Sequence, residues 1–176
     1  TMITDMVKQI GGDKVQLTGL MGPGVDPHLY EPIPSDGIAL SEADLIFYNG
    51  LFLEGQMTSN LKSQGGIDFG STLSEDQIKG QKSHPDPHIW GNAEIWANCV
   101  PLVVKELSAV DPPNSSHYKK RGDQLIKELR DLHQWSRSRV DSLPEDSRIL
   151  ITSHDAFEYF GEAYGFEVVA LQGIST

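Results

Sequence analysis

Residues 115–143 read SSHYKKRGDQLIKELRDLHQWSRSRVDSL and carry one continuous helical pattern. Small or apolar residues recur every three or four positions, at Tyr118, Gly122, Leu125, Leu129, Leu132, Ser136, Val140 and Leu143. Asn114 or Ser115 can cap the start, and Pro144 stops the pattern. At 1.5 Å per residue, roughly 30 helical residues span on the order of 43 Å, which is long for one small domain. The sequence therefore predicts a helix long enough to join two lobes.

The residues before this helix alternate between helical and strand patterns. The predicted segments are a helix at 3–10, a strand at 15–20, a short helix at 35–43 capped by Ser35 or Asp36, a strand at 45–48, a helix at 53–61, a strand at 67–69, a polar loop at 71–87, and a helix at 96–107 that Pro101 either kinks or starts. Alternation of this kind is typical of a parallel sheet covered by helices. We therefore assign residues 1–113 to an N-terminal α/β lobe and residues 114–143 to the connecting helix.

The residues after the long helix predict the start of a second α/β lobe at 144–176. Residues 148–152 form a strand, 156–164 a helix closed by Gly165, and 166–171 a second strand. Two strands and one helix leave a sheet edge and a sheet face uncovered, and such a unit is marginal alone. We therefore expect the second lobe to be incomplete in this chain.

The charge and the cysteine content limit the classes of binding partner and the types of metal ligand. The 176 residues include 14 Lys and Arg against 25 Asp and Glu, a formal net charge of −11. Such an excess repels phosphate backbones and anionic lipid headgroups, so nucleic acid and membrane surfaces are poor partners and cations are better ones. Cys99 is the only cysteine, so a metal site would use histidine or carboxylate ligands.

Three histidines occupy positions suited to ligand binding. Residues 26–28 and 86–88 both read Asp-Pro-His, and His154 follows a predicted strand. Ligands in open α/β sheets bind beyond the carboxyl ends of strands, and the prolines hold His28 and His88 on stiff loops. The spacings match no local zinc motif. On the pattern alone, a metal site formed in the tertiary structure and three hydrogen-bonded loop histidines are both compatible with the sequence.

Several longer motifs resemble the extracytoplasmic receptors of ABC importers for zinc and manganese. These motifs are GPGVDPHLYEP at 22–32, ADLI at 43–46, YNGL at 48–51, DPHIW at 86–90, TSHDAFEYF at 152–160 and LQGIST at 171–176. The resemblance runs in register from the first helix to the last residue. It implies two α/β lobes joined by one rigid long helix, with a metal ion in the cleft between them.

Carried over by position, the resemblance makes His28 and His88 the metal ligands from the first lobe and His154 the first ligand from the second. Family members complete the site with an acidic residue further along the second lobe. The resemblance thus implies a chain truncated at both ends, with roughly a hundred further residues after Thr176, given typical domain sizes, and a first strand before Thr1.

The resemblance also implies cargo, partner and location. Three neutral imidazoles favour Zn²⁺, with Mn²⁺ as the second choice because it prefers more oxygen ligands. The ion would be the transported ligand, handed to the membrane permease of an ABC importer. The receptor would be a monomer, periplasmic or anchored outside the membrane, and not an enzyme.

A zinc-dependent hydrolase is the alternative, because a three-histidine ion with an open position can activate water. Asp155 and Glu31 are the sequence neighbours that could act as general base. No nucleophile elbow, phosphate-binding glycine loop or dinucleotide fingerprint is present in the sequence.

The remaining histidines and tryptophans have simpler interpretations. His84 is expected to be a solvated loop residue, and His117 and His133 surface residues of the long helix. Trp90, Trp96 and Trp135 are expected to pack in the core.

Overall fold

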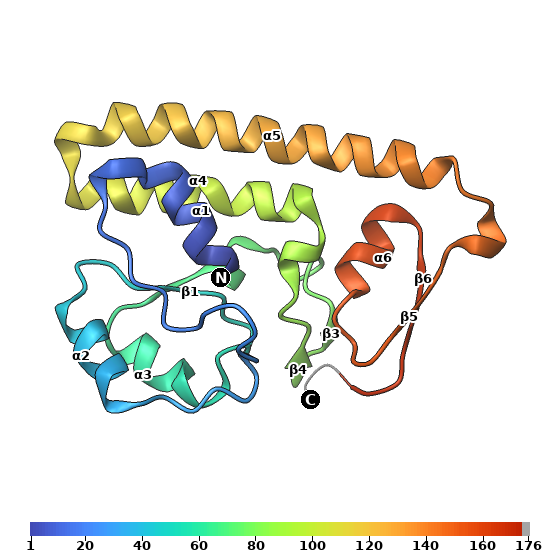
Figure 1. The fold of residues 1–176 in the computed structure, drawn as a ribbon, viewed down its shortest axis with the longest axis horizontal. Helices are drawn as coiled ribbons and strands as arrows, with labels where there is room; N and C mark the ends of the chain where they lie inside the picture. The colour runs from blue at the N-terminus through green and yellow to red at the C-terminus, as the bar shows by residue number, and fades with distance from the viewer. Residues whose placement is uncertain (174–176) are drawn as a thin grey trace.

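The computed structural model describes residues 1–173 and is built around one long helix (Figure 1). Helix α5, Ser115–Asp141, has 27 residues and runs the length of the molecule, with the other elements along one side of it. This confirms the long helix predicted from the apolar spacing. Asn114 occupies the N-cap position, as expected, but its side chain makes no capping hydrogen bond.

Helix α4, Ala93–Val110, lies along α5, and α1, Met2–Gly11, packs against both. Asn92 caps α4 by accepting hydrogen bonds from the amides of Glu94 and Ile95 at 3.0 and 3.4 Å. The helix therefore starts well before Pro101 and continues through it, so Pro101 does not set the start. The main core fills the space between these helices with buried side chains that include Ile10, Phe69, Val100, Val103 and Tyr118.

A two-stranded parallel sheet lies beneath α1, with β1, Phe47–Tyr48, paired to β2, Ile67–Asp68. The expected strand at 15–20 is wrong. Val15 has extended dihedral angles, yet no residue of 15–20 joins a sheet in the described part of the chain, because an extended segment becomes a strand only when a neighbour completes its hydrogen bonds.

Two short helices flank this sheet, α2 at Pro34–Glu42 and α3 at Thr58–Ser63. The expected cap at Ser35 or Asp36 is wrong by two or three residues, because Ile33 occupies the cap position. Asp36 lies inside the first turn, where its carboxylate accepts from the Ile33 amide at 2.8 Å and the Tyr30 hydroxyl at 2.7 Å. The side chain still satisfies the helix start, but from the third helical position.

The expected polar loop at 71–87 contains a small antiparallel hairpin, β3, Gly80–Gln81, with β4, His84–Pro85. Short 3₁₀ turns complete the connections, at Gly12–Lys14, Gly55–Met57, Phe69–Thr72, Ile89–Gly91, Pro112–Asn114 and Glu145–Ser147. No helix in the described part of the chain is both long and apolar enough to cross a membrane.

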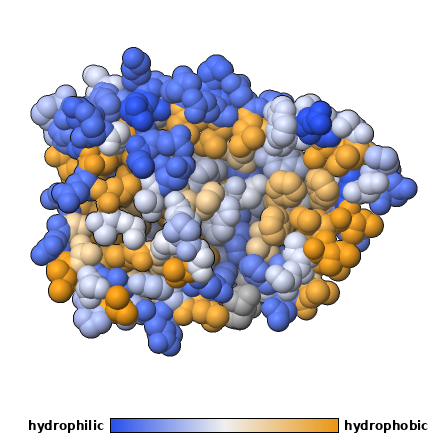
Figure 2. Space-filling view, viewed as in Figure 1, coloured by the Kyte–Doolittle hydropathy of each residue, from blue (hydrophilic) through white to orange (hydrophobic). Residues whose placement is uncertain are grey.

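Beyond α5, strand β5, Ile149–Thr152, pairs in parallel with β6, Glu167–Ala170, and α6, Glu158–Tyr164, connects them. Gly165 ends α6 in the left-handed conformation, at φ 75°, as its position predicts. Ile149 and Ile151 are more than half exposed, and Figure 2 shows hydrophobic surface gathered at this end of the molecule. One face of this small sheet is therefore uncovered in the described residues.

Candidate metal site

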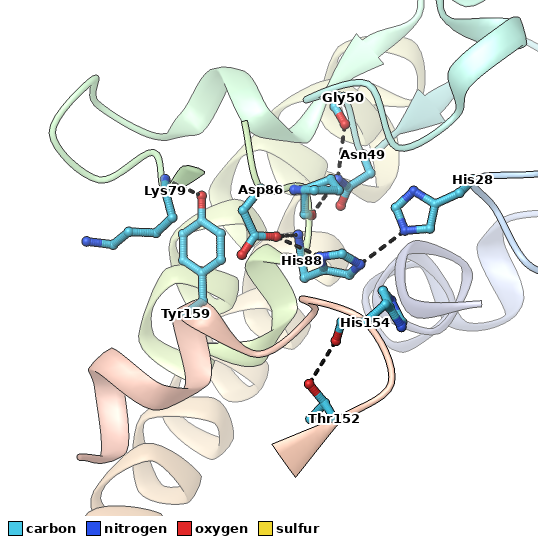
Figure 3. Close-up of polar contacts among 10 residues, drawn as sticks. His28, Asn49, Gly50, Lys79, Asp86, His88, Thr152, His154 and Tyr159 are labelled. Carbon is cyan, nitrogen blue, oxygen red and sulfur yellow. Dashed lines mark hydrogen bonds and ion pairs between the residues drawn. The ribbon is translucent and has the colours of Figure 1, made fainter. Parts of the chain in front are cut away.

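The imidazoles of His28, His88 and His154 converge from three separate loops (Figure 3). One nitrogen from each ring lies within 4.8 Å of the others. His28 comes from the loop before α2, His88 directly precedes the 3₁₀ turn that leads to α4, and His154 lies between β5 and α6. The fold thus brings together all three residues that the sequence singles out.

The two closest nitrogens have the spacing of a chelating pair. The Nε2 atoms of His28 and His88 are 3.2 Å apart. Two imidazole nitrogens bound to one tetrahedral zinc ion at about 2.0–2.1 Å lie about 3.3 Å from each other. The pair therefore needs little movement to bind a single ion.

Asp86 orients His88 through both its backbone and its ring. Its Oδ1 accepts from the His88 amide at 2.9 Å and lies 2.6 Å from Nδ1 of the same residue. A carboxylate accepts only, so Nδ1 carries the hydrogen, and in the neutral ring Nε2 presents its lone pair toward His28. Both residues are almost completely buried, which holds this arrangement in place. Asp26 repeats the backbone part of this turn, accepting from the His28 amide at 2.9 Å.

A second support comes from the turn after β1. The Asn49 side chain donates to the carbonyl of Pro87, the residue before His88, at 2.9 Å. Buried Glu54 accepts from the amides of Asn49 and Gly50 at 2.6 and 3.1 Å. Burial outweighs these bonds and raises the pKa of Glu54. The loop that carries His88 is thus held by Asp86 and, through the Pro87 carbonyl, by Asn49.

The backbone of this turn is strained. Gly50 has φ 77°, and the next two residues, Leu51 and Phe52, also have positive φ values of 52° and 64°. Residues other than glycine rarely adopt this region of backbone dihedral angles. Such strain persists only where surrounding contacts impose it. The Glu54 carboxylate bonds at the start of the turn are contacts of that kind.

His154 lies at the carboxyl end of β5, as expected for a ligand in an open α/β sheet. The Thr152 hydroxyl donates a hydrogen bond to the His154 carbonyl at 2.8 Å, which stabilises the loop that carries His154. On the other side of the site, partial burial and then the neighbouring His88 lower the pKa of His28, so the neutral ring that a metal needs is favoured.

Comparison with known proteins places the chain in a family. The family model described as zinc-uptake complex component A periplasmic, ZnuA, matches residues 1–176. The chain belongs to the ZnuA family. It is 38% identical to the manganese-binding lipoprotein MntA of Bacillus subtilis, over all of this chain and 60% of MntA. It is 40% identical to the zinc-binding protein TroA of Treponema pallidum, over 99% of this chain and 58% of TroA.

Comparison with solved structures supports the same family membership. The periplasmic zinc-binding protein TroA of Treponema pallidum superposes with a TM-score of 0.94 at 39% identity, covering 99% of this chain and 65% of TroA. The expected fold class, an α/β solute-binding protein fold with parallel sheets and a long connecting helix, is confirmed. The chain spans about three-fifths of the length of the curated relatives it matches.

Sequence reasoning misses the residues that support the site. The sequence shows Asp86 only as part of a stiff tripeptide, and Asn49 only as the end of a strand. The motif itself holds a signal, because an aspartate two residues before a histidine can accept from that histidine's backbone amide. Nothing local points from Asn49 to Pro87, which lies 38 residues away.

The expectations for the other histidines and tryptophans are right for some residues and wrong for others. His84 is exposed and bonds to Ser83, as expected, and His117 is half-buried against the Gly11 carbonyl. The expectation for His133 is wrong, because it is buried against the Tyr164 ring. The expectation for Trp135 is also wrong, because its side chain is 60% exposed.

Proposed function

We propose that the protein containing this chain is a high-affinity receptor for a divalent transition-metal ion, which it delivers to the membrane permease of an ABC importer. The observation that carries the proposal is the convergence of His28, His88 and His154, with one ligand atom each inside a 4.8 Å cluster. Membership of the ZnuA family supports the same function.

We propose that His28, His88 and His154 bind the ion through imidazole nitrogens, which leaves one position of a tetrahedral ion for a further ligand. Three neutral nitrogens favour Zn²⁺, and Mn²⁺ is the second candidate. The names of two relatives support both choices, since TroA is a zinc-binding and MntA a manganese-binding protein.

We infer that residues 1–113 form the N-terminal lobe, 114–143 the connecting helix and 144–176 the start of the C-terminal lobe, although 174–176 lie outside the described residues. His28 and His88 then belong to one lobe and His154 to the other. The ion would be held between them, so that its binding and release depend on how the two lobes are placed.

We also propose a monomeric receptor that works outside the cytoplasmic membrane, periplasmic or anchored to it. The family description contains the word periplasmic, and MntA is a lipoprotein. The protein would not be an enzyme. The cluster that could hold a metal in the described residues is made of three histidines and includes no carboxylate ligand.

Calorimetric titration of the full-length protein with Zn²⁺ and Mn²⁺ tests this function. We expect one ion per chain, with Zn²⁺ bound more tightly. The zinc-loaded protein should not hydrolyse simple esters above the rate of free Zn²⁺. Failure to bind either ion would contradict the receptor function, and metal-dependent turnover would favour the hydrolase.

A further inference from the structure

Helix α6, which follows the His154 loop, is bonded to the hairpin that precedes His88. Tyr159 of α6 is completely buried, and its hydroxyl accepts a hydrogen bond from the backbone amide of Lys79 at 3.1 Å (Figure 3). The Lys79 side chain also forms an ion pair with Glu162 one turn further along α6. These bonds connect elements that lie on opposite sides of α5 in the sequence.

The Tyr159 bond continues into the His88 ring through consecutive hydrogen bonds. The Lys79 carbonyl accepts from the Asp86 amide at 2.9 Å. The Asp86 carboxylate then lies 2.6 Å from Nδ1 of His88 and also accepts from the His88 amide. At the other end, Tyr159 is on the helix that begins directly after the His154 loop. An unbroken path therefore joins the segment of one imidazole to the ring of another.

We propose that Tyr159 is a positioning residue that sets the separation between His88 and His154. This role rests on the proposed function of the three histidines in metal binding. The two imidazoles come from distant segments, and their ring centroids are 5.5 Å apart. A metal site tolerates misplacement of only about 0.5 Å, so one ligand needs a fixed reference to the other. The Tyr159 to Lys79 bond supplies that reference.

Tyr164 shows why the role belongs to Tyr159 and not to the packing of α6 as a whole. Tyr164 is also buried on α6, and its hydroxyl accepts from a backbone amide, that of Ala93, at 3.3 Å. Ala93 begins α4 and lies beyond His88, outside the path through Asp86. The two tyrosines thus make similar bonds between the same two parts of the chain, and only one bond leads to the site.

The test compares Tyr159→Phe with Tyr164→Phe in the full-length protein, with Glu162→Gln as a control for the ion pair. Zinc affinity is measured by competition with a chelating dye, coordination geometry by the visible spectrum of bound Co²⁺, and stability by metal-free thermal unfolding. We expect Tyr159→Phe to weaken zinc binding about threefold to tenfold, the size of one lost buried hydrogen bond, and to alter the Co²⁺ spectrum. Tyr164→Phe and Glu162→Gln should keep both readouts at the level of the unsubstituted protein.

Equal effects of the two phenylalanine variants on zinc affinity and on the Co²⁺ spectrum would overturn the role. Absence of metal binding by the unsubstituted protein would instead overturn the proposed function, and this role with it. Lys79→Pro removes the amide donor, together with the ion pair that Glu162→Gln tests separately, and keeps the Tyr159 side chain, so it gives a second reading if Tyr159→Phe does not fold. We expect the same spectral change from it, and an unchanged spectrum would count against the proposal.

Discussion

Nε2 of His28 faces Nε2 of His88 at 3.2 Å, although 60 residues separate the two histidines in the sequence. In the neutral His88 ring, the Nδ1 hydrogen is directed at Asp86, and the lone pair of Nε2 then points to His28. In the absence of metal, the hydrogen on Nε2 of His28 satisfies that lone pair. A metal ion bound in place of this hydrogen would meet two nitrogens that already face each other.

Single replacement of His28, His88 or His154 by alanine should weaken zinc binding by at least about 100-fold each, because the site loses one of its three nitrogen ligands. Calorimetric titration of the full-length protein measures the change. His84→Ala is the matched control, since His84 is exposed on the hairpin and outside the cluster. Unchanged affinity in one of the three variants would remove that residue from the ligand set.

Asp86→Asn should weaken zinc binding about 10-fold to 100-fold, as is common when a metal-bound histidine loses its carboxylate partner. The asparagine oxygen can still accept from the His88 amide, but its charge is lost. Asp86→Ala removes both bonds and should cost more. Nitrogen NMR of His88 gives a readout without metal, since Nδ1 carries the hydrogen in the unsubstituted protein. The Nδ1–H form persisting undiminished in Asp86→Ala would show that Asp86 does not control the ring.

The long helix and the three histidines could be predicted because each has a local signal. An uninterrupted apolar spacing between a capping residue and Pro144 specifies α5 without reference to the rest of the fold. The stiff Asp-Pro-His loops and the strand-end position of His154 single out the ligand candidates. The support from Asn49 and Glu54 could not be predicted, because a hydrogen bond to the Pro87 carbonyl exists only after folding.

The wrong expectations about which residues of α5 are buried also arise from contacts that form only on folding. The pattern places Leu132 on the buried face, but Leu132 is 48% exposed and the next residue, His133, is buried. Helix α5 packs mainly against α4 and α1, whereas His133 meets the ring of Tyr164 of α6. A single helical stripe cannot describe a helix whose packing partner changes along its length.

Glu54→Gln should change how stability depends on pH. Burial raises the pKa of Glu54 above its ordinary value of 4.5, so folding favours the protonated carboxyl. The contribution of Glu54 to the free energy of unfolding is fully present below pH 4.5 and is lost as the pH rises through the folded-state pKa. The free energy of unfolding then falls by at most about 1.4 kcal/mol per pH unit. Urea unfolding of the full-length protein between pH 4 and 8 should show this loss in the unsubstituted protein and not in Glu54→Gln. Exposed Glu75→Gln is the control, and parallel curves for the unsubstituted protein and Glu54→Gln would contradict the prediction.

Two helical glycines should respond to alanine with opposite signs. A Cβ at Gly161 of α6 would lie 2.6 Å from Cγ2 of Val168 and 2.9 Å from the backbone oxygen of Phe166, so the helix would have to move away from β6. We expect Gly161→Ala to lower the free energy of unfolding by about 1–3 kcal/mol. A Cβ at exposed Gly37 of α2 meets nothing within 4 Å, and Gly37→Ala should raise the free energy by about 0.5–1 kcal/mol. Urea unfolding of both variants measures the difference, and stabilisation by Gly161→Ala would show that α6 is not held as tightly against β6 as these distances require.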